Sequence, residues 1–599
     1  MTRIAVLDQE RCRPDDCGRV CYRFCPMVRS RVEAIVFEPD NEKPHIIENL
    51  CSGCGICIKK CPFGAITIVN LPDEIEGTII HRFGPNTFQL HRLPTPTAGK
   101  ITGLIGKNGV GKTTVLRILT GDIKPNLGRY DNSPEWDEIV QYHRGSTLQS
   151  YFDDLSQGIL KVAYKPQYVS RLPLAVKGRL VDLLQKVDEK NQLDRVIEDF
   201  ELDNLLDRNL DVLSGGELQR AAIAATIMRE ADAYLFDEPS SYLDARQRLR
   251  ISKSIRGLAT EEKRVFVVEH DLAILDYLSD NVCVLFGEPG AYGIVSRPHS
   301  VRVGINIYLE GYLPDENVRF REQPIKFRSH PTTEGWASSE TSVSWPKLTK
   351  TFDKFQLVAE AGEIFKGEVV GILGPNGIGK TTFIKILAGI EEPEEAENHP
   401  IEGGTVSYKP QYISGQYKGT VEDLLKTVAE TDFGTSYFKT SILRPSGLER
   451  LLDRNVDELS GGELQKVAIA VCLSRKADIY LLDEPSAYLD VEERLSTART
   501  IRRIVEARNA NAFVVEHDVA SQDFIADRLI IFKGSPGLKG TSTAPMPLRD
   551  GMNDFLRDIG ITFRRDLTTQ RPRVNKTGSR ADRFQKEIEE YYYSTPTSG

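Results

Sequence analysis

Two apolar runs in this chain are each followed by a glycine-rich loop and then by a helical pattern. The runs Ile101–Ile105 and Val369–Leu373 have the length and composition of buried strands. Beyond each loop, apolar positions return at helical spacing, in Val115–Leu119 and Phe383–Leu387. The order strand, loop, helix therefore occurs twice, and it predicts two α/β domains of one kind.

Both loops match the pattern G-x-x-x-x-G-K-[ST], as Gly106–Thr113 and Gly374–Thr381. Glycines in this pattern let backbone N–H groups surround a triphosphate, while the lysine reaches the β- and γ-phosphates and the threonine hydroxyl binds Mg²⁺. The predicted nucleotide-binding residues are Asn108, Gly109, Gly111, Lys112, Thr113 and Thr114 in the first copy, and Asn376, Gly377, Gly379, Lys380, Thr381 and Thr382 in the second.

Four further motifs follow each loop in the same order: Tyr-Lys-Pro-Gln-Tyr, Leu-Ser-Gly-Gly-Glu, an apolar strand ending in Asp-Glu, and Val-Glu-His. The aspartate at the strand end is predicted to hold Mg²⁺, and the adjacent glutamate can act as general base on the attacking water. The histidine can contact the γ-phosphate, and the glutamine can sense Mg²⁺ and the water. The residues are Gln167, Asp237, Glu238 and His270 in the first copy, and Gln411, Asp483, Glu484 and His517 in the second.

The Leu-Ser-Gly-Gly-Glu motif predicts a helix start, where N–H groups and the positive end of the helix dipole suit a γ-phosphate. Its residues are Ser214, Gly216 and Glu217 in the first copy, and Ser460, Gly462 and Glu463 in the second. Because lysine, aspartate, glutamate and histidine are present in both copies, both sites are predicted to hydrolyse nucleotide.

The two copies differ in one spacing. The signature serine precedes the aspartate by 23 residues in both, but loop and glutamine are 61 residues apart in the first copy and 37 in the second. The 24 extra residues are best placed near 130–155, and Asp131–Trp136 has the capping residue and proline of a helix start. A helix–loop–helix is expected at about 130–160, either as a docking element for a large partner or as a tolerated surface insertion.

Eight of the ten cysteines precede residue 62. Cys51-x₂-Cys54-x₂-Cys57-x₃-Cys61-Pro is the bacterial ferredoxin run, whose fourth cysteine serves the other cluster. A looser run upstream, with Cys12, Cys17, Cys21 and Cys25, also ends in Cys-Pro. Exchange of the fourth ligands predicts two [4Fe–4S] clusters, one held by Cys12, Cys17, Cys21 and Cys61, the other by Cys25, Cys51, Cys54 and Cys57.

Two alternatives for the cysteines stay open at this point: a pair of zinc–thiolate sites, and clusters that transfer electrons. No flavin or other redox motif accompanies them, which favours a structural or sensing role. The remaining two cysteines, Cys283 and Cys472, lie in apolar runs and are expected in the core.

The composition and charge of the chain exclude some classes of protein. The chain has 599 residues, of which 40% are hydrophobic and 27% charged, as is ordinary for a globular protein. It contains no apolar run of 18 residues and no apolar signal core at its start, so neither a membrane span nor export is expected. Its net charge of −9 argues against coating nucleic acid through bulk electrostatics, and its cysteines fit the reducing cytoplasm.

Candidate residues for adenine stacking can also be named from the sequence. Phe83 is the first copy's candidate for stacking on adenine, and Trp345 or Phe352 is the candidate of the second copy.

Residues 293–345 are interpreted as a packed hinge followed by a polar exposed loop at 329–335, and the alternative is a plain linker. Between residues 557 and 576, six Arg or Lys stand against two Asp, which indicates either a surface for a phosphate backbone or a solvated run.

The ordered motifs resemble the ATP-binding cassette family, which the Leu-Ser-Gly-Gly-Glu signature sets apart from other phosphate-loop ATPases. The cysteine domain, the insertion and the tail Phe563–Lys576 extend this resemblance to the whole chain, which is similar to the RNase L inhibitor family, subfamily E. The chain resembles the archaeal form of this family more than the eukaryotic one. The implied fold is a ferredoxin-like α+β domain (1–75), a first cassette (76–292), a hinge and linker (293–345), a second cassette (346–540) and a C-terminal hinge with a basic tail (541–599).

This resemblance implies a cytoplasmic ATPase that splits ribosomes into subunits after termination or rescue and can stay on the small subunit into initiation. Its implied partners are the small subunit with its ribosomal RNA, a release or rescue factor, and initiation factors, but neither a membrane nor DNA. It would be a monomer whose cassettes face head to tail, with Ser460 closing the site at Lys112 and Ser214 that at Lys380. Rival readings are the ATPase pair of a transporter, an iron–sulfur oxidoreductase, and an iron–sulfur ATPase in cluster assembly or DNA metabolism.

Overall fold

A computed structural model of the chain describes residues 3–37, 42–70, 78–327, 341–394, 404–411 and 417–593. The polar loop expected at 329–335 lies outside these residues. The chain divides into two compact units, residues 1–241, 251–270 and 278–325 in the first, and residues 242–250, 271–277 and 326–599 in the second. Each unit is described by itself.

The first unit begins with a small cysteine-rich α+β domain. Strands β1 (Arg3–Leu7) and β4 (Ile66–Asn70) pair antiparallel, as do β2 (Ile35–Phe37) and β3 (Pro44–Ile46). Four short helices lie between them: α1 (Pro14–Cys17), α2 (Val20–Phe24), α3 (Pro26–Arg29) and α4 (Ile56–Lys60). Its small core joins apolar side chains such as Ala5 and Ile46 to the cysteines themselves. Such a domain depends on its cysteines because its core is small.

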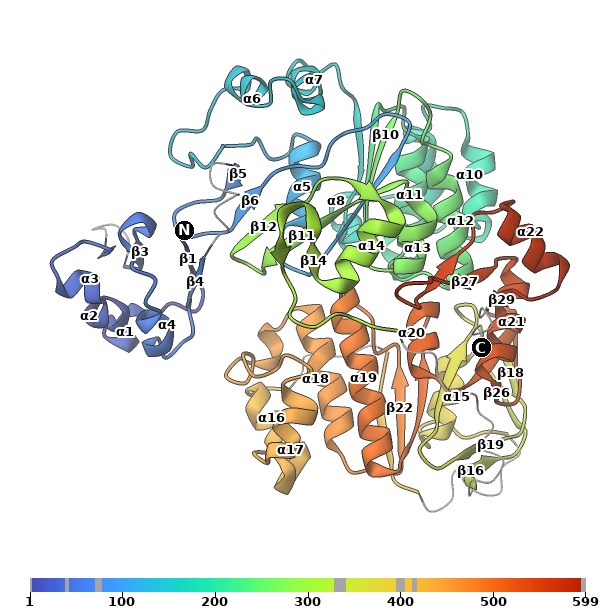
Figure 1. The fold of residues 1–599 in the computed structure, drawn as a ribbon. Coiled ribbons are helices and arrows are strands. Elements are labelled where there is room, and N and C mark those ends of the chain that lie inside the picture. Colours follow the sequence, from blue (N-terminus) through green and yellow to red (C-terminus); the bar gives the residue numbers. More distant parts are fainter. Residues whose placement is uncertain are drawn as a thin grey trace. The chain divides into compact units, whose positions relative to one another are not determined.

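A nine-stranded sheet forms the centre of the first cassette (Figure 1). Its order is β5-β6-β12-β11-β7-β10-β9-β8, with β13 beside β11, and the strands from β11 to β8 are parallel. The strands are β5 (Ile79–Arg82), β6 (Gln89–His91), β7 (Ile101–Gly106), β8 (Val162–Lys165), β9 (Ala233–Asp237), β10 (Arg264–Val268), β11 (Asn281–Glu288), β12 (Tyr292–Val295) and β13 (His299–Ser300).

Helices cover this sheet. Helix α5 packs on β7, β9 and β10, α11 on β8 and β9, and α14 on β11. The helices of the first unit are α5 (Lys112–Leu119), α8 (Leu172–Ala175), α9 (Leu180–Val187), α10 (Leu193–Phe200), α11 (Gly215–Met228) and α14 (Val301–Glu310), and the short strands β14 (Tyr312–Leu313) and β15 (Val318–Arg319) follow. Helix α12 (Ala245–Arg256) is divided between the two units, and α13 (Leu272–Leu278) belongs almost entirely to the second. The predicted hinge begins with the end of β12 and with β13, and the helix that follows them is α14, whose residues Ile305 and Leu309 are buried in the first unit.

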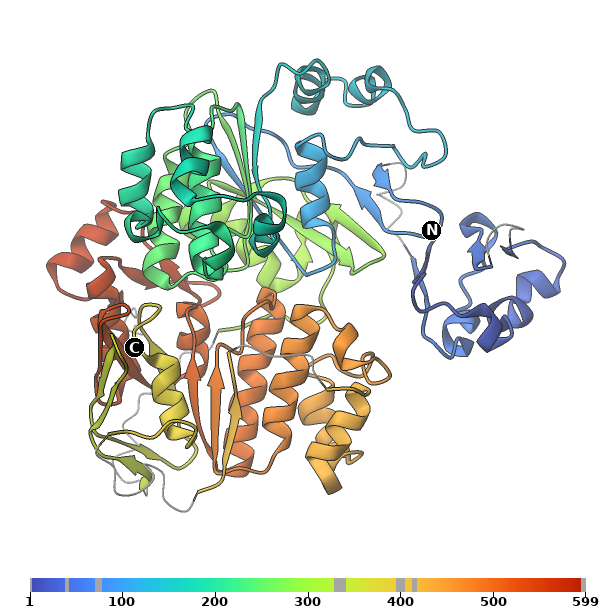
Figure 2. The same cartoon turned by 180° about the vertical axis from the view of Figure 1, so that it is seen from behind.

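The 24 extra residues of the first copy lie in a pair of helices, α6 (Trp136–Tyr142) and α7 (Thr147–Ser156). The two helices lie side by side on long connections at one end of the unit (Figures 1 and 2). Buried Ile139 and Phe152 join them to the cassette core. The pair is therefore packed against the first cassette rather than loosely inserted.

The second unit contains a sheet with the same strand order, β17-β18-β25-β24-β20-β23-β22-β21, with β26 beside β24. The repeated sequence therefore gives a repeated fold. Its strands are β17 (Leu348–Thr351), β18 (Gln356–Ala359), β20 (Val369–Leu373), β21 (Val406–Lys409), β22 (Ile479–Asp483), β23 (Asn511–Val515), β24 (Arg528–Ser535), β25 (Lys539–Ser542) and β26 (Met546–Pro547), and β16 (Thr341–Trp345) pairs with β19 (Gly362–Phe365).

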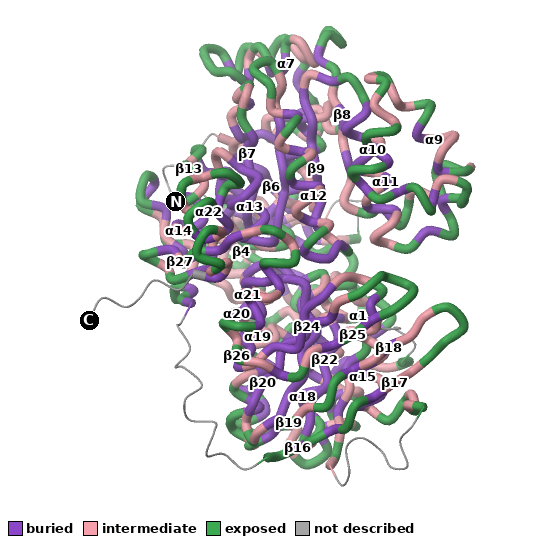
Figure 3. The backbone as a smooth tube through the Cα atoms, turned by 90° about the vertical axis from the view of Figure 1, so that its right-hand side faces the viewer, coloured by how far each residue is buried: buried purple, intermediate pink, exposed green. Residues whose placement is uncertain are grey.

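The helices of the second unit are α15 (Lys380–Leu387), α16 (Val421–Ala429), α17 (Ser436–Phe438), α18 (Gly461–Ser474), α19 (Val491–Arg508) and α20 (Val519–Ile525). The C-terminal segment adds α21 (Leu548–Ile559), α22 (Arg580–Glu587) and a small sheet of β27 (Phe563–Arg565), β28 (Pro572–Val574) and β29 (Tyr592–Tyr593). In Figure 3 the central strands β20 and β22 are buried along their length. Cys283 and Cys472 are buried in the core, as predicted.

Candidate functional site

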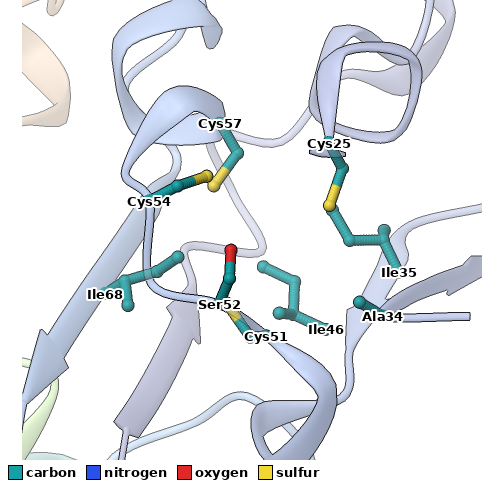
Figure 4. A pocket seen from close by; sticks show the side chains of 9 residues that line it. All are labelled: Cys25, Ala34, Ile35, Ile46, Cys51, Ser52, Cys54, Cys57 and Ile68. Atoms are coloured by element: carbon teal, nitrogen blue, oxygen red, sulfur yellow. The ribbon is translucent and has the colours of Figure 1, made fainter. Parts of the chain in front are cut away.

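The eight N-terminal cysteines gather in two groups. Cys25, Cys51, Cys54 and Cys57 line one pocket together with apolar residues such as Ile35 and Ile46 (Figure 4). Cys54 and Cys57 lie on one side of this pocket and Cys25 opposite them. The other four form the second group, in which burial raises the pKa of both Cys12 and Cys21 and the nearby Cys17 and Cys61 raise it further.

Two short helices explain this grouping. Helix α2 carries Cys21 and is followed by Cys25, whereas α4 carries Cys57 and is followed by Cys61. Helices α2 and α4 pack against each other. Each helix, with the residue that follows it, therefore brings one cysteine to each group.

Burial affects the chemistry of these thiols. It raises the pKa of Cys21 to about 11, and the neighbouring thiols Cys12, Cys17 and Cys61 add to the rise. Burial likewise raises the pKa of Cys57 to about 11, with Cys51, Cys54 and Cys25 as the neighbouring thiols. Four clustered thiols cannot ionise together without a compensating positive charge, so each group favours a bound metal centre over free thiolates.

The two phosphate loops connect a buried strand to a helix. Gly111 and Gly379 precede α5 and α15 with φ values of +93° and +99°, a region that favours glycine. A Cβ on Gly111 would meet the Phe88 ring at 2.6 Å, which is a second reason for glycine there. Lys112 Nζ donates to the carbonyl oxygens of Gly106 and Lys107 at 2.9 and 2.7 Å, so the lysine lies over its own loop.

A threonine and an aspartate meet at the base of each phosphate loop. Thr113 Oγ1 donates to Asp237 Oδ2 at 2.8 Å, and Thr381 Oγ1 to Asp483 Oδ2 at 2.7 Å. Burial, together with the adjacent glutamate, raises the pKa of each aspartate to about 6. Within the described residues, the other carboxylate oxygen of each aspartate is buried and accepts no hydrogen bond. A threonine hydroxyl beside a buried carboxylate with one unused oxygen suits a hard divalent cation.

The glutamate that follows each aspartate is held by two side chains. Gln167 Nε2 donates to Glu238 Oε1 at 2.7 Å, and Gln411 Nε2 to Glu484 Oε1 at 2.7 Å. His270 Nε2 lies 3.2 Å from Glu238 Oε1. Burial by itself would raise the pKa of Glu238, but His270, Lys112 and Lys165 outweigh it and lower the pKa to about 2.

Both signature motifs begin a helix, as expected. Ser214 is the N-cap of α11, and its Oγ accepts the N–H of Glu217 while the Glu217 carboxylate accepts the N–H of Ser214. Ser460 and Glu463 form the same reciprocal pair at the start of α18. Each helix therefore presents its first turn, with Gly216 or Gly462, in a fixed orientation.

Comparisons with known proteins agree with this geometry. The ABC transporter family model matches residues 95–241 and 361–487, a 4Fe-4S binding domain matches 44–67, and a possible Fer4-like domain in RNase L inhibitor matches 2–33. An uncharacterized ABC transporter ATP-binding protein of Methanocaldococcus jannaschii is 54% identical over 99% of this chain and 97% of its own.

The translation initiation factor RLI1 of Saccharomyces cerevisiae is 46% identical over 99% of this chain and 98% of its own. A solved structure of ribosome-bound archaeal Pelota and ABCE1 includes a chain that matches with a TM-score of 0.92, at 53% identity over 99% of both chains. The chain belongs to the RNase L inhibitor family of ATP-binding cassette proteins. It is an ATPase with iron–sulfur clusters. None of the helices described in the structure could cross a membrane.

The three aromatic residues considered for adenine stacking differ in how far they are exposed in this RNase L inhibitor family chain. Phe83 is 52% exposed and meets His81 edge-on. Trp345 is 3% exposed, and its ring packs between Phe383 and Phe513 in the core, so its prediction as a stacking residue is wrong. Phe352 is 41% exposed and remains the second cassette's candidate.

Three of the six basic residues in the tail of this family member form ion pairs within the second unit. Arg571 is completely buried, and Arg573 Nε lies 2.6 Å from Asp276 Oδ2, to which Arg571 is also paired. Arg565 pairs with Asp523 at 2.6 Å. Because these arginines neutralise buried carboxylates inside the second unit, the phosphate-backbone interpretation of the tail is wrong for them.

Sequence reasoning missed four residues at the hydrolytic sites of this RNase L inhibitor family chain: Lys165, Glu269, Lys409 and Glu516. The lysines lie two positions before Gln167 and Gln411, and the glutamates directly precede His270 and His517. All four are buried. Their signal was present in the sequence, because Tyr-Lys-Pro-Gln-Tyr and Val-Glu-His occur in both copies.

Proposed function

We propose that this chain is an ATP-driven ribosome-recycling factor, which splits ribosomes into subunits and can remain on the small subunit into initiation. One observation carries the proposal: the chain matches, over 99% of its length, an ABCE1 that was solved bound to a ribosome together with Pelota. A second relative is an archaeal ribosome recycling factor solved with the ribosomal stalk protein aP1. The partners would be the small subunit with its ribosomal RNA, a release or rescue factor, and initiation factors, in the cytoplasm.

We further propose two [4Fe–4S] clusters. Cys12, Cys17, Cys21 and Cys61 would hold one, and the four cysteines of the pocket in Figure 4 the other. The mutual influence of the thiols within each group supports this division. Since α2 and α4 contribute to both groups, the clusters would fasten the domain together. This structural use is preferred to electron transfer.

Each nucleotide site is proposed to hold Mg²⁺, which supplies positive charge to the β- and γ-phosphates when bound. Thr113, Gln167 and Asp237 would hold it in the first cassette, and Thr381, Gln411 and Asp483 in the second. The unused buried oxygen of each aspartate supports the assignment. Lys112 and Lys380 would turn from their own loop carbonyls to the phosphates.

Glu238 and Glu484 are proposed as general bases. A pKa lowered to about 2 keeps each carboxylate ionised and able to accept a proton from water. His270 and His517 would contact the γ-phosphate and keep the carboxylate oriented. In a chain that acts as a monomer, each ATP would be enclosed by the phosphate loop of one cassette and the signature serine of the other, Ser460 over Lys112 and Ser214 over Lys380.

Sedimentation tests the proposal. Archaeal ribosomes are incubated with the purified chain, a rescue factor and ATP, then separated on a sucrose gradient, with a non-hydrolysable ATP analogue as control. Conversion of intact particles to subunits with ATP is the expected result. Intact particles without co-sedimenting protein would contradict it and leave an iron–sulfur ATPase that acts in cluster assembly or DNA metabolism.

A further inference from the structure

A buried lysine holds the backbone of the proposed general base in each cassette. Lys165 ends strand β8 and is completely buried, and its Nζ donates to the carbonyl oxygens of Asp237 at 2.8 Å and Glu238 at 3.2 Å. In the second cassette, Lys409 Nζ donates to the carbonyl oxygens of Asp483 at 2.8 Å and Glu484 at 3.0 Å. A buried ammonium group needs such acceptors, and here both belong to the hydrolytic motif.

A buried glutamate holds the same segment two residues further on. The Glu269 carboxylate accepts the N–H and the hydroxyl of Ser240, each at 2.9 Å. The Glu516 carboxylate accepts the same two groups of Ser486, at 2.7 and 2.6 Å. The segment that contains each catalytic glutamate is therefore fixed by a lysine side chain at the glutamate itself and by a glutamate side chain two residues further on.

The segment needs this support because its backbone is strained. Glu238 and Glu484 both have a φ of +48°, in the left-handed region that non-glycine residues rarely adopt. Such a conformation persists only where the surroundings enforce it. Gln219 Nε2 also donates to the Glu238 carbonyl oxygen, at 2.7 Å, so the strained peptide is bound from two sides.

We infer that Lys165 and Lys409 are positioning residues for ATP hydrolysis, each of which fixes the backbone of its glutamate so that the carboxylate faces the attacking water. The inference rests on the proposed role of Glu238 and Glu484 as bases. Neither lysine is the phosphate ligand of its site, since that role belongs to Lys112 and Lys380. Both lysines therefore act on the rate of hydrolysis through another residue and not on nucleotide affinity.

The test replaces each lysine by methionine, which keeps an unbranched stem and removes the ammonium group. Lys165→Met is made in the Glu484→Gln background and Lys409→Met in Glu238→Gln, so that one site at a time turns over. We expect kcat to fall about ten- to a hundredfold, the range for losing hydrogen bonds to a charged group, while the Kd for ATP changes by less than about twofold. Lys190→Met is the matched control, because Lys190 donates to the Ile227 carbonyl oxygen and Tyr234 near the opposite end of β9.

Several outcomes overturn the inference. The inference fails if both lysine variants keep the kcat of their background proteins. It also fails if the variants bind ATP more weakly, with a raised Kd, while kcat is unchanged. If Lys165→Met fails to fold, judged by thermal unfolding, Lys165→Gln retains one donor group and is expected to give an intermediate kcat; parent-like kcat in that variant also overturns the inference. If Glu238→Gln and Glu484→Gln keep parent turnover, the proposed base fails instead, which separates the two failures.

Discussion

His517 Nε2 and Glu484 Oε1 lie 3.1 Å apart, and His270 and Glu238 repeat this relationship at 3.2 Å in the first cassette. The contact ties the strand end that carries the histidine to the strand end that carries the proposed base. Since His517 is buried, its orientation is set by this contact and by the surrounding core.

Loss of the histidine contact is expected to slow hydrolysis. In His517→Ala, Glu484 loses a contact that fixes the orientation of its carboxylate, and turnover at that site should fall about tenfold or more. His517→Gln retains a donor and should recover part of the rate. Steady-state phosphate release in the Glu238→Gln background measures the effect, and equal rates for His517→Ala and the parent would contradict it.

Removal of the proposed base should trap ATP. Glu238→Gln and Glu484→Gln each keep the shape of the side chain but cannot accept the proton, so turnover at the altered site should fall about a hundredfold or more. Radiolabelled ATP that stays on the protein through gel filtration measures the trapping. Unchanged turnover in both variants would mean that another group activates the water.

Double cysteine variants test the exchange of ligands between the two proposed iron–sulfur clusters. Cys61→Ser should reduce iron from about eight to about four atoms per chain. Adding Cys12→Ser should leave about four, whereas adding Cys51→Ser should leave almost none, because those cysteines belong to different groups. The reverse result would assign Cys61 to the group of Cys51. Cys283→Ala serves as control, since this buried cysteine lies in the cassette core and should not change the iron content.

The two aromatic residues of the second cassette should behave differently. Trp345→Ala removes a core side chain and should lower the free energy of unfolding by about 3–5 kcal/mol, without a selective effect on nucleotide affinity. Phe352→Ala removes an exposed ring and should leave stability near that of the parent while weakening ATP binding. Chemical denaturation and nucleotide titration separate the two effects, and unchanged affinity in Phe352→Ala would exclude it as the stacking residue.

Acid should destabilise the first unit through His91. This histidine of β6 is 1% exposed, and burial, reinforced by Arg92, lowers its pKa from 6.5 to about 4. The unfolded chain binds the proton more readily, so the stability from His91 is complete above pH 6.5 and is lost as the pH falls toward 4. At 1.4 kcal/mol per pKa unit the loss is at most about 3 kcal/mol. Urea unfolding of the parent and His91→Leu at several pH values should show a flatter pH dependence in the variant; parallel curves would contradict it.

Features that depend on residues close together in the sequence could be predicted, whereas features that depend on packing between distant residues could not. The phosphate loops and the signature helices follow from residues within one turn of each other. Trp345 could not be recognised as a core residue because Phe383 and Phe513, which enclose it, lie far along the sequence. The tail arginines were misread for the same reason, since Asp276 lies almost 300 residues before Arg571. Lys165 was missed although its motif is repeated, because the motif does not reveal that the partners of the lysine are backbone carbonyls.

The crossing of cysteines between α2 and α4 has a consequence for the time course of synthesis. The group nearest the start of the chain is complete only with Cys61, and the later group requires Cys25 from before it. With the ligand sets proposed above, a growing chain that has released only its first thirty or so residues would hold three cysteines of one cluster and one of the other, and could close neither. Metal loading would then be deferred until the whole N-terminal domain has emerged.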